Sequence, residues 1–126
     1  MAPALEEANR LLRLALRDRS TFELLLPLPQ ASIAAIGFHA QQAVEKALKA
    51  VCTLKSIEVR RTHDLAALSQ ALIDNGVALP ISVDEFRTLN PFAVEYRYDD
   101  EIASSMTREE LNGLVTKVLT WAALEF

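Results

Sequence analysis

Residues 38–51, which read FHAQQAVEKALKAV, place several polar side chains at the spacing of one face of an α-helix. Side chains three or four positions apart are neighbours on a helix, so amide, carboxylate, ammonium and imidazole groups would share one side. Ammonium groups on such a face can hold phosphate. The alternative is a solvated surface, because Gln, Glu and Lys are ordinary exposed residues. The residues concerned are His39, Gln41, Gln42, Glu45, Lys46 and Lys49.

Two further polar groups follow, and three groups on different helices can converge in a helical bundle. Their basic side chains could then hold a phosphate, the N–H groups at the start of the next helix could assist, and a tyrosine could stack on a base. The second group is Arg61, Thr62, His63 and Asp64; the third, after Asn90-Pro91, is Glu95, Tyr96, Arg97 and Tyr98. The basic side chains proposed for phosphate are Lys46, Arg61 and Arg97.

Both added groups also have a structural interpretation. His63 and Asp64 could simply belong to a helix cap. One tyrosine could lie in the core and the other at a subunit interface, since a buried Tyr with a bonded hydroxyl is common. Arg97 could pair with Glu45 or Asp99. None of the three groups is specific by itself.

Charge is distributed unevenly along the chain. The net charge of −4 argues against a general polyanion binder. Between residues 45 and 63, however, five basic side chains face two acidic ones, a local charge of +3. The sequence therefore leaves room for a localised anion site.

The remaining composition excludes several classes of protein. The single Cys52 cannot form an internal disulfide, and with two His it does not complete a structural zinc site, so we expect no metal or cofactor. We expect Cys52 to be a small buried hydrophobe. The N-terminus lacks the pattern of a secretory signal, and polar residues interrupt the apolar stretch after Ala31. We expect a soluble cytoplasmic protein.

Apolar periodicity and capping residues predict one all-α domain over residues 1–126, an antiparallel up-and-down helical bundle of about five helices. The expected helices are residues 4–18, 29–54, 63–75, 82–98 and 108 onward, the fourth interrupted at Asn90-Pro91. Pro27 and Pro29 place a break over residues 20–29. Thr62 is the expected cap of the third helix, and Thr107 begins a capping box.

The same periodicity predicts which side chains face the core. We expect Gly37 to permit a close helix crossing. The expected core residues are Leu5, Leu12, Ala15 and Leu16 in the first helix, Leu65, Leu68, Leu72 and Ile73 in the third, and Leu111, Leu114, Val115, Val118, Leu119 and Ala122 in the last.

The order of FHAQQAVEKALKAV, RTHDL and LNPFAVEYRY resembles the HEPN (higher eukaryotes and prokaryotes nucleotide-binding) domain family. The resemblance implies a bundle of about five helices, frequent homodimerisation and, in many prokaryotic members, a minimal nucleotidyltransferase as partner. Carried over by matching positions, it implies a ligand site at Gln42, Glu45, Lys46, Thr62, His63, Asp64, Glu95, Tyr96 and Arg97; the charge argument adds Lys49 and Arg61.

The ribonuclease members of the family carry an Arg followed by four to six residues and a His. Neither His39 nor His63 has an Arg at that spacing, so we expect no catalytic residue. We predict a nucleotide- or nucleic-acid-binding module that partners a minimal nucleotidyltransferase in a toxin–antitoxin-like system. The alternatives are a purely structural dimerisation or interaction module, and a divergent metal-independent ribonuclease using His63 with Arg97.

Overall fold

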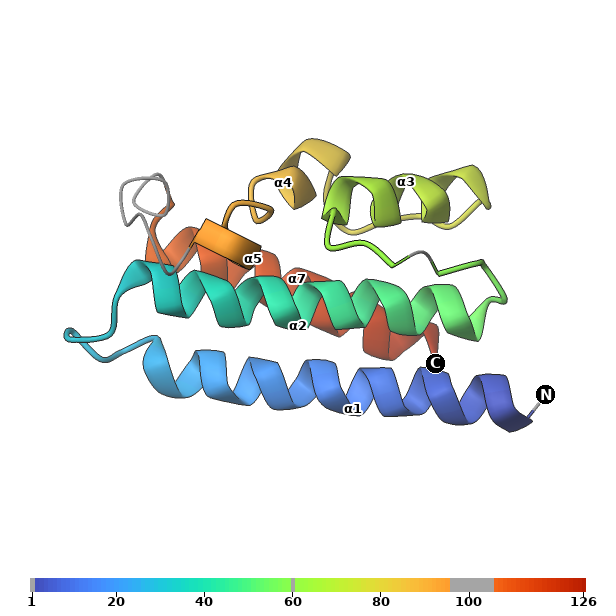
Figure 1. Ribbon diagram of the computed structural model, residues 1–126, viewed down its shortest axis with the longest axis horizontal. Helices are drawn as coiled ribbons and strands as arrows, with labels where there is room; N and C mark the ends of the chain where they lie inside the picture. Colours follow the sequence, from blue (N-terminus) through green and yellow to red (C-terminus); the bar gives the residue numbers. More distant parts are fainter. Residues whose placement is uncertain (1, 60, 96–105) are drawn as a thin grey trace.

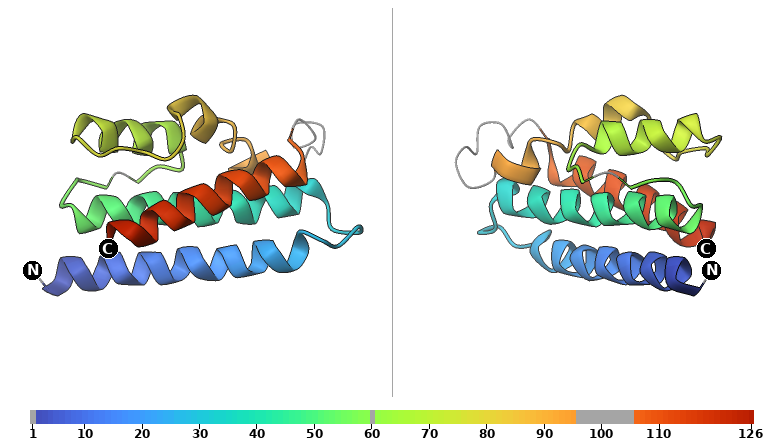
Figure 2. Two further views of the ribbon diagram at one scale, coloured as in Figure 1. Left: turned by 180° about the vertical axis from the view of Figure 1, so that it is seen from behind. Right: turned by 45° about the vertical axis from the view of Figure 1, so that its right-hand side comes forward.

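The computed structural model describes residues 2–59, 61–95 and 106–126, and every regular element among them is helical. Figure 1 shows α2 at the centre, where it packs against α1, α3, α5 and α7. α1 and α2 form an antiparallel hairpin, whereas α3 and α7 run in the direction of α2 (Figure 2). The all-α bundle is confirmed. Its helices are α1 (Ala2–Leu25), α2 (Ile33–Leu54), α3 (Leu65–Asp74), α4 (Val83–Arg87), α5 (Phe92–Glu95) and α7 (Arg108–Glu125).

The first helix is longer than predicted, because α1 continues to Leu25 instead of ending near residue 18. Pro27 disfavours helix at the residue before it and has no N–H to donate, but the N–H groups of residues 19–25 can still bond to carbonyls four positions earlier. The hydroxyls of Ser20 and Thr21 donate to helix carbonyls one turn earlier, and Phe22 is fully buried. The predicted break over residues 20–29 is therefore wrong for its first half.

The buried face of α1 was also only partly predicted. Ala8, Ala15 and Phe22, seven residues apart, form its buried strip, while Leu5 and Leu16 are exposed. A strip of this seven-residue spacing is the narrow seam of two closely packed helices. The prediction that Leu5 and Leu16 face the core is therefore wrong.

α2 begins at Ile33, because residues 25–31 form successive turns and the Ser32 hydroxyl caps the helix by accepting from the Ala35 N–H at 3.1 Å. The predicted start at Pro29 is therefore four residues early. The helix ends at Leu54 as predicted.

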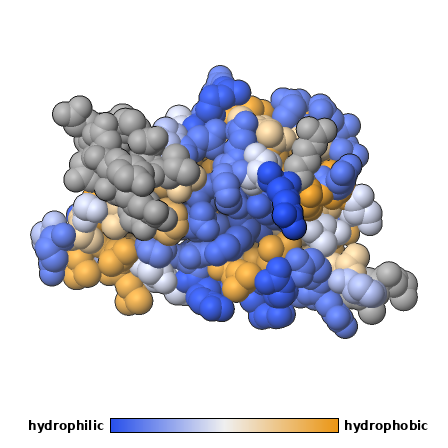
Figure 3. Space-filling view, viewed as in Figure 1, coloured by the Kyte–Doolittle hydropathy of each residue, from blue (hydrophilic) through white to orange (hydrophobic). Residues whose placement is uncertain are grey.

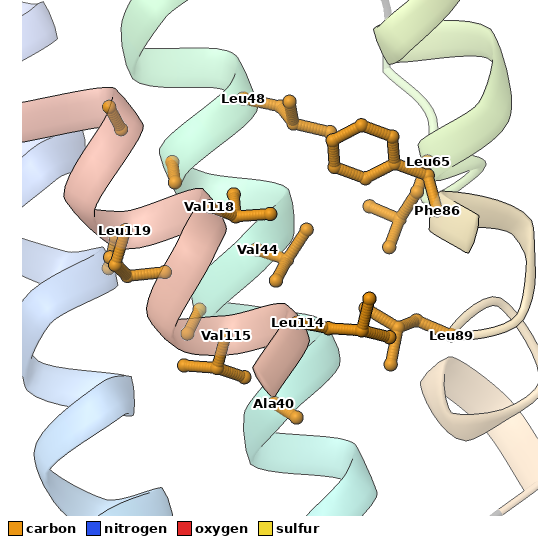
Figure 4. Close-up of a cluster of buried hydrophobic side chains, with 14 of the residues drawn as sticks. Ala40, Val44, Leu48, Leu65, Phe86, Leu89, Leu114, Val115, Val118 and Leu119 are labelled. Carbon is orange, nitrogen blue, oxygen red and sulfur yellow. The ribbon is translucent and has the colours of Figure 1, made fainter. Parts of the chain in front are cut away.

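The core lies where α2 meets α7 and the segment containing α3, α4 and α5. Figure 4 shows Val44 and Leu48 of α2 facing Leu65, Phe86 and Leu89 across this core. The predicted inner face of α7 is confirmed at all six positions, and the Thr107 capping box is present. Cys52 is fully buried in the same core, as expected.

α3 is shorter than predicted and begins at Leu65, because Asp64 and not Thr62 is its N-cap. Leu65, Leu68 and Leu72 are buried as predicted, but Ile73 is exposed. A helix of ten residues packs on one side only, and Ile73 lies on its outer side. Ser82 caps α4, and the predicted interruption at Asn90-Pro91 separates α4 from α5.

Gly37 permits close packing, but of a side chain and not of a helix backbone. A Cβ atom at Gly37 would lie 2.1 Å from Cδ1 of Phe92, whose ring is buried against α2. The absence of a side chain at Gly37 therefore lets α5 dock on α2.

Candidate functional site

The carboxylate of Glu45 is the centre of a hydrogen-bond network on α2. Its Oε1 atom accepts from Gln41 Nε2 at 2.9 Å and lies 2.9 Å from His63 Nδ1, and its Oε2 atom accepts from Lys49 Nζ at 2.9 Å. Gln41 and Glu45 are buried. The solvated-surface interpretation is therefore wrong for these two residues.

The three donors determine the charge state of Glu45. Burial acts to raise the pKa of this carboxyl, but the bonds from Lys49, Gln41 and His63 outweigh it and hold the pKa below its ordinary value. Glu45 is thus a buried carboxylate whose charge is balanced by a neighbouring ammonium group. Such a group is fixed in position by its partners.

His63 shows how this network reaches the surface. Its side chain is 70 % exposed, whereas that of Glu45 is 6 % exposed. The contact at Nδ1 fixes the imidazole ring and leaves Nε2, on the opposite edge, facing away from Glu45. Nε2 accepts a hydrogen bond when the ring is neutral and donates one when it is protonated. The network therefore holds an exposed imidazole in one orientation.

Lys46 lies on the polar face of α2, at the edge next to α1, and pairs with Asp18 of that helix. His39 Nδ1 lies 3.8 Å from the second oxygen of Asp18, too far for a hydrogen bond. Lys46 thus joins α2 to α1. Sequence reasoning missed Asp18 because the first helix was expected to end there; an acidic residue facing a lysine across a helical hairpin was the available signal.

The cap segment is held by a residue that the sequence marked only as a helix break. Asn90 donates from Nδ2 to Asp64 Oδ1 at 2.9 Å, and its Oδ1 accepts from the Leu65 N–H at 2.9 Å. Asp64 also accepts from the Ala66 N–H at 3.0 Å, so the helix-cap interpretation holds for Asp64. The Asn90 bond is the main cause of the lowered pKa of Asp64.

The other predicted residues fall into three situations. Gln42 donates to Gln41 Oε1 at 2.7 Å and extends the Glu45 network. Arg61 is exposed and makes no ion pair with any described residue, and Thr62 accepts from the Asp64 N–H at 3.0 Å. Tyr96, Arg97 and Tyr98, together with the side chain of Glu95, lie outside the described residues.

The structure thus brings together two of the three predicted groups. Figure 3 shows a hydrophilic surface over the middle of α2, between α1 and α3. Within the described residues no group of three His, Cys, Asp or Glu side chains has the arrangement of a metal site. The chemistry that the two groups offer is binding of an anion by imidazole, guanidinium and ammonium groups.

A family model for the HEPN domain matches residues 8–125, nearly the whole chain. The chain belongs to the HEPN family. It is therefore a helical module of a family associated with nucleotides and nucleic acids. Searches of curated proteins and of solved structures gave no significant match. Among the described helices of this HEPN protein, none combines the length and apolar character needed to cross a bilayer.

Proposed function

We propose that this HEPN protein binds the phosphate groups of a nucleotide or an RNA at the polar face of α2 and the adjoining 61–64 segment. The observation that supports this most strongly is the contact of His63 with Glu45. A buried carboxylate that already has Lys49 and Gln41 as partners also holds an exposed imidazole in one orientation. Such preorganisation lowers the entropy cost of binding a ligand.

The proposed residues have two kinds of role. His63, Arg61 and Lys49 would contact phosphate, with Gln42 and Lys46 beside them. Glu45, Thr62 and Asp64 would act as positioning residues, since their side-chain oxygens accept bonds from neighbouring groups. Glu95, Tyr96 and Arg97 remain predicted members of the site, Arg97 for phosphate and Tyr96 for a base.

A thermal-shift screen with ATP, ADP, GTP and a short single-stranded RNA tests this proposal. A ligand at 100 times its dissociation constant should stabilise the wild type by about 2.7 kcal/mol. His63→Ala and Arg61→Ala should remove most of that shift. Arg13→Ala, which removes an exposed positive charge from α1, should keep it. No shift of the folded wild type with any of these ligands would refute the proposal.

The interaction module is the second candidate, and a specific observation favours it. Two of the motif residues make contacts within the chain itself: Lys46 pairs with Asp18 of α1, and Glu45 with His63 of the segment before α3. If the face only holds the bundle together, substitutions there will lower stability and no ligand will bind. Cleavage of RNA by the purified wild type but not by His63→Ala would instead support the divergent ribonuclease.

The partner proposal is that the protein forms a cytoplasmic homodimer and pairs with a minimal nucleotidyltransferase in a toxin–antitoxin-like system. Its support is the family membership. If a nucleotidyltransferase gene adjoins this one, co-expression should yield a complex that stays together in size-exclusion chromatography with light scattering. Separate elution of the two proteins would contradict it.

A further inference from the structure

The outer side of α7 carries a groove that no described helix covers. Figure 2 shows α7 on the outside of the bundle, in front of α2 in the left view. A hollow of about 320 Å³ lies along the first half of α7, against Glu85 and Thr88. A second hollow of about 470 Å³ lies along its last half, against Pro80. Lys117 lines both hollows, so they adjoin along one side of the helix.

The groove has room for a second helix at Gly113. This residue lines the first hollow, and a Cβ atom there would meet nothing within 4 Å. A glycine inside a helix costs about 1 kcal/mol relative to alanine, but it lets another backbone approach closely. The packing of a single copy of the chain does not use that close approach. A partner that crosses α7 at this point would use it.

Two opposite charges lie on either side of Gly113. Glu110 precedes it by three residues, Lys117 follows it by four, and both line the first hollow. The two side chains are seven residues apart, about 10 Å along the helix, so they do not pair with each other. Lys117 makes no ion pair with any described residue. Glu110 Oε1 accepts from the Thr107 N–H at 2.9 Å, which leaves Oε2 for a further donor.

A second copy of the chain offers a partner to each charge. Residues seven apart lie on the same flank of a helix, and Glu110 and Lys117 are nearly equidistant from Gly113. A two-fold axis between two antiparallel α7 helices that cross at Gly113 therefore places Glu110 of each copy beside Lys117 of the other. A parallel crossing would bring like charges together, which is unfavourable. The charges thus select the antiparallel arrangement.

The apolar residues at the end of α7 fit the same arrangement. Leu124 is 79 % exposed, the highest value among the large hydrophobic side chains of the described residues. Trp121 lines the same hollow, and its indole N–H donates to the Ala78 carbonyl at 2.9 Å. In an antiparallel pair, this end of one α7 lies against the start of the other, where Met106 lines the first hollow. The contact would remove apolar surface of both copies from water.

We infer that α7 forms a homodimer interface in which two copies cross antiparallel at Gly113, with Glu110 of each copy paired to Lys117 of the other. The inference rests on the homodimer of the proposed function and assigns the surface that forms it. None of the described residues of the proposed phosphate site lines this groove. The dimer surface and the phosphate site can therefore be tested separately.

Size-exclusion chromatography with light scattering, over a range of concentrations of the full chain, tests the inference. The wild type should dimerise. Lys117→Glu and Glu110→Lys should each weaken dimerisation by about tenfold or more, since each variant places like charges at both pairs. An equimolar mixture of the two variants should dimerise again, because opposite charges then meet at both pairs. Arg13→Glu makes the same charge change at an exposed site on α1 and should dimerise like the wild type.

Circular dichroism establishes that each variant is folded, and four results would then overturn the inference. Dimers of Lys117→Glu as stable as those of the wild type would place the homodimer on another surface and leave the homodimer proposal intact. A mixture of the two variants that stays monomeric would exclude the antiparallel pairing. Equal weakening in Arg13→Glu would indicate an effect of net charge. A wild type that is monomeric at every concentration would refute the homodimer itself and leave the groove to a different protein.

Discussion

The Nδ1 atom of His63 and the Oε1 atom of Glu45 lie 2.9 Å apart and join the central helix to the segment just before α3. The two residues are separated by eighteen positions in the chain. One is buried and the other is largely exposed, so the contact connects the interior of the bundle to its surface. The predictions that follow test this contact and the packing that supports it.

Glu45→Ala should destabilise the fold by about 1–3 kcal/mol. The substitution leaves the amide of Gln41 buried without an acceptor for Nε2 and leaves Lys49 without its counter-ion. Urea unfolding measures the loss. Glu23→Ala removes an exposed carboxylate whose one ion-pair partner among the described residues is Arg19 of the same helix, and its effect should stay within about 0.5 kcal/mol. Equal effects of the two variants would show that the Glu45 network contributes no special stability.

Acid should reduce the contribution of Glu45 to the stability of the folded protein. Because its pKa is lower in the folded state than in the unfolded chain, the stabilisation is complete above the unfolded pKa and is lost as pH falls through the folded one. The stability difference between wild type and Glu45→Gln should therefore shrink as pH falls below about 5. Urea unfolding at several pH values measures it, and a difference that is constant in this range would refute the assignment.

Gly37→Ala should destabilise the protein by about 1–3 kcal/mol although alanine is the better helix former. The new methyl group would overlap the ring of Phe92 and force α5 away from α2. Gly113→Ala is the matched control, because a Cβ at Gly113 of α7 meets no atom within 4 Å. This substitution should stabilise the protein by up to about 1 kcal/mol. Stabilisation by both substitutions would disprove the packing role of Gly37.

The thiol of Cys52 should be unreactive in the native protein. Burial raises its pKa to about 11, and the thiolate is the nucleophile. At about pH 8, reaction with an aromatic disulfide reagent should therefore be slow in buffer and fast in guanidinium chloride. Rapid reaction of the folded protein would mean that this part of the core opens readily.

The sequence predicted the buried face correctly where a helix has one regular apolar pattern and packs along most of its length. The inner face of α7 and the centre of α2 follow from apolar spacing alone, because each packs along most of its length. The end of α1 was missed because the prolines were taken to end the helix too early. Ile73 was misplaced because periodicity does not tell how wide the covered face of a short helix is.

The site was predictable in its composition but not in its contacts. The types and spacing of Gln42, Glu45 and Lys46 indicated a polar face, and RTHDL indicated a cap. That Glu45 would bond to His63 while Lys46 turned to Asp18 depends on how three helices pack, which no local pattern specifies. Asn90 illustrates the same limit, since its role as a second cap of α3 depends on residues 25 and 26 positions away.

Histidine NMR tests the proposed phosphate site most directly, because the chain has only two His residues. In a ¹³C–¹H spectrum of ring-labelled protein, with signals assigned from His63→Gln, titration with ATP or a short RNA should shift the His63 ring signal. The His39 signal, from the ring beside Asp18, should stay in place and serve as an internal reference. A ligand that binds without moving the His63 signal, or that moves only that of His39, would contradict the site proposed here.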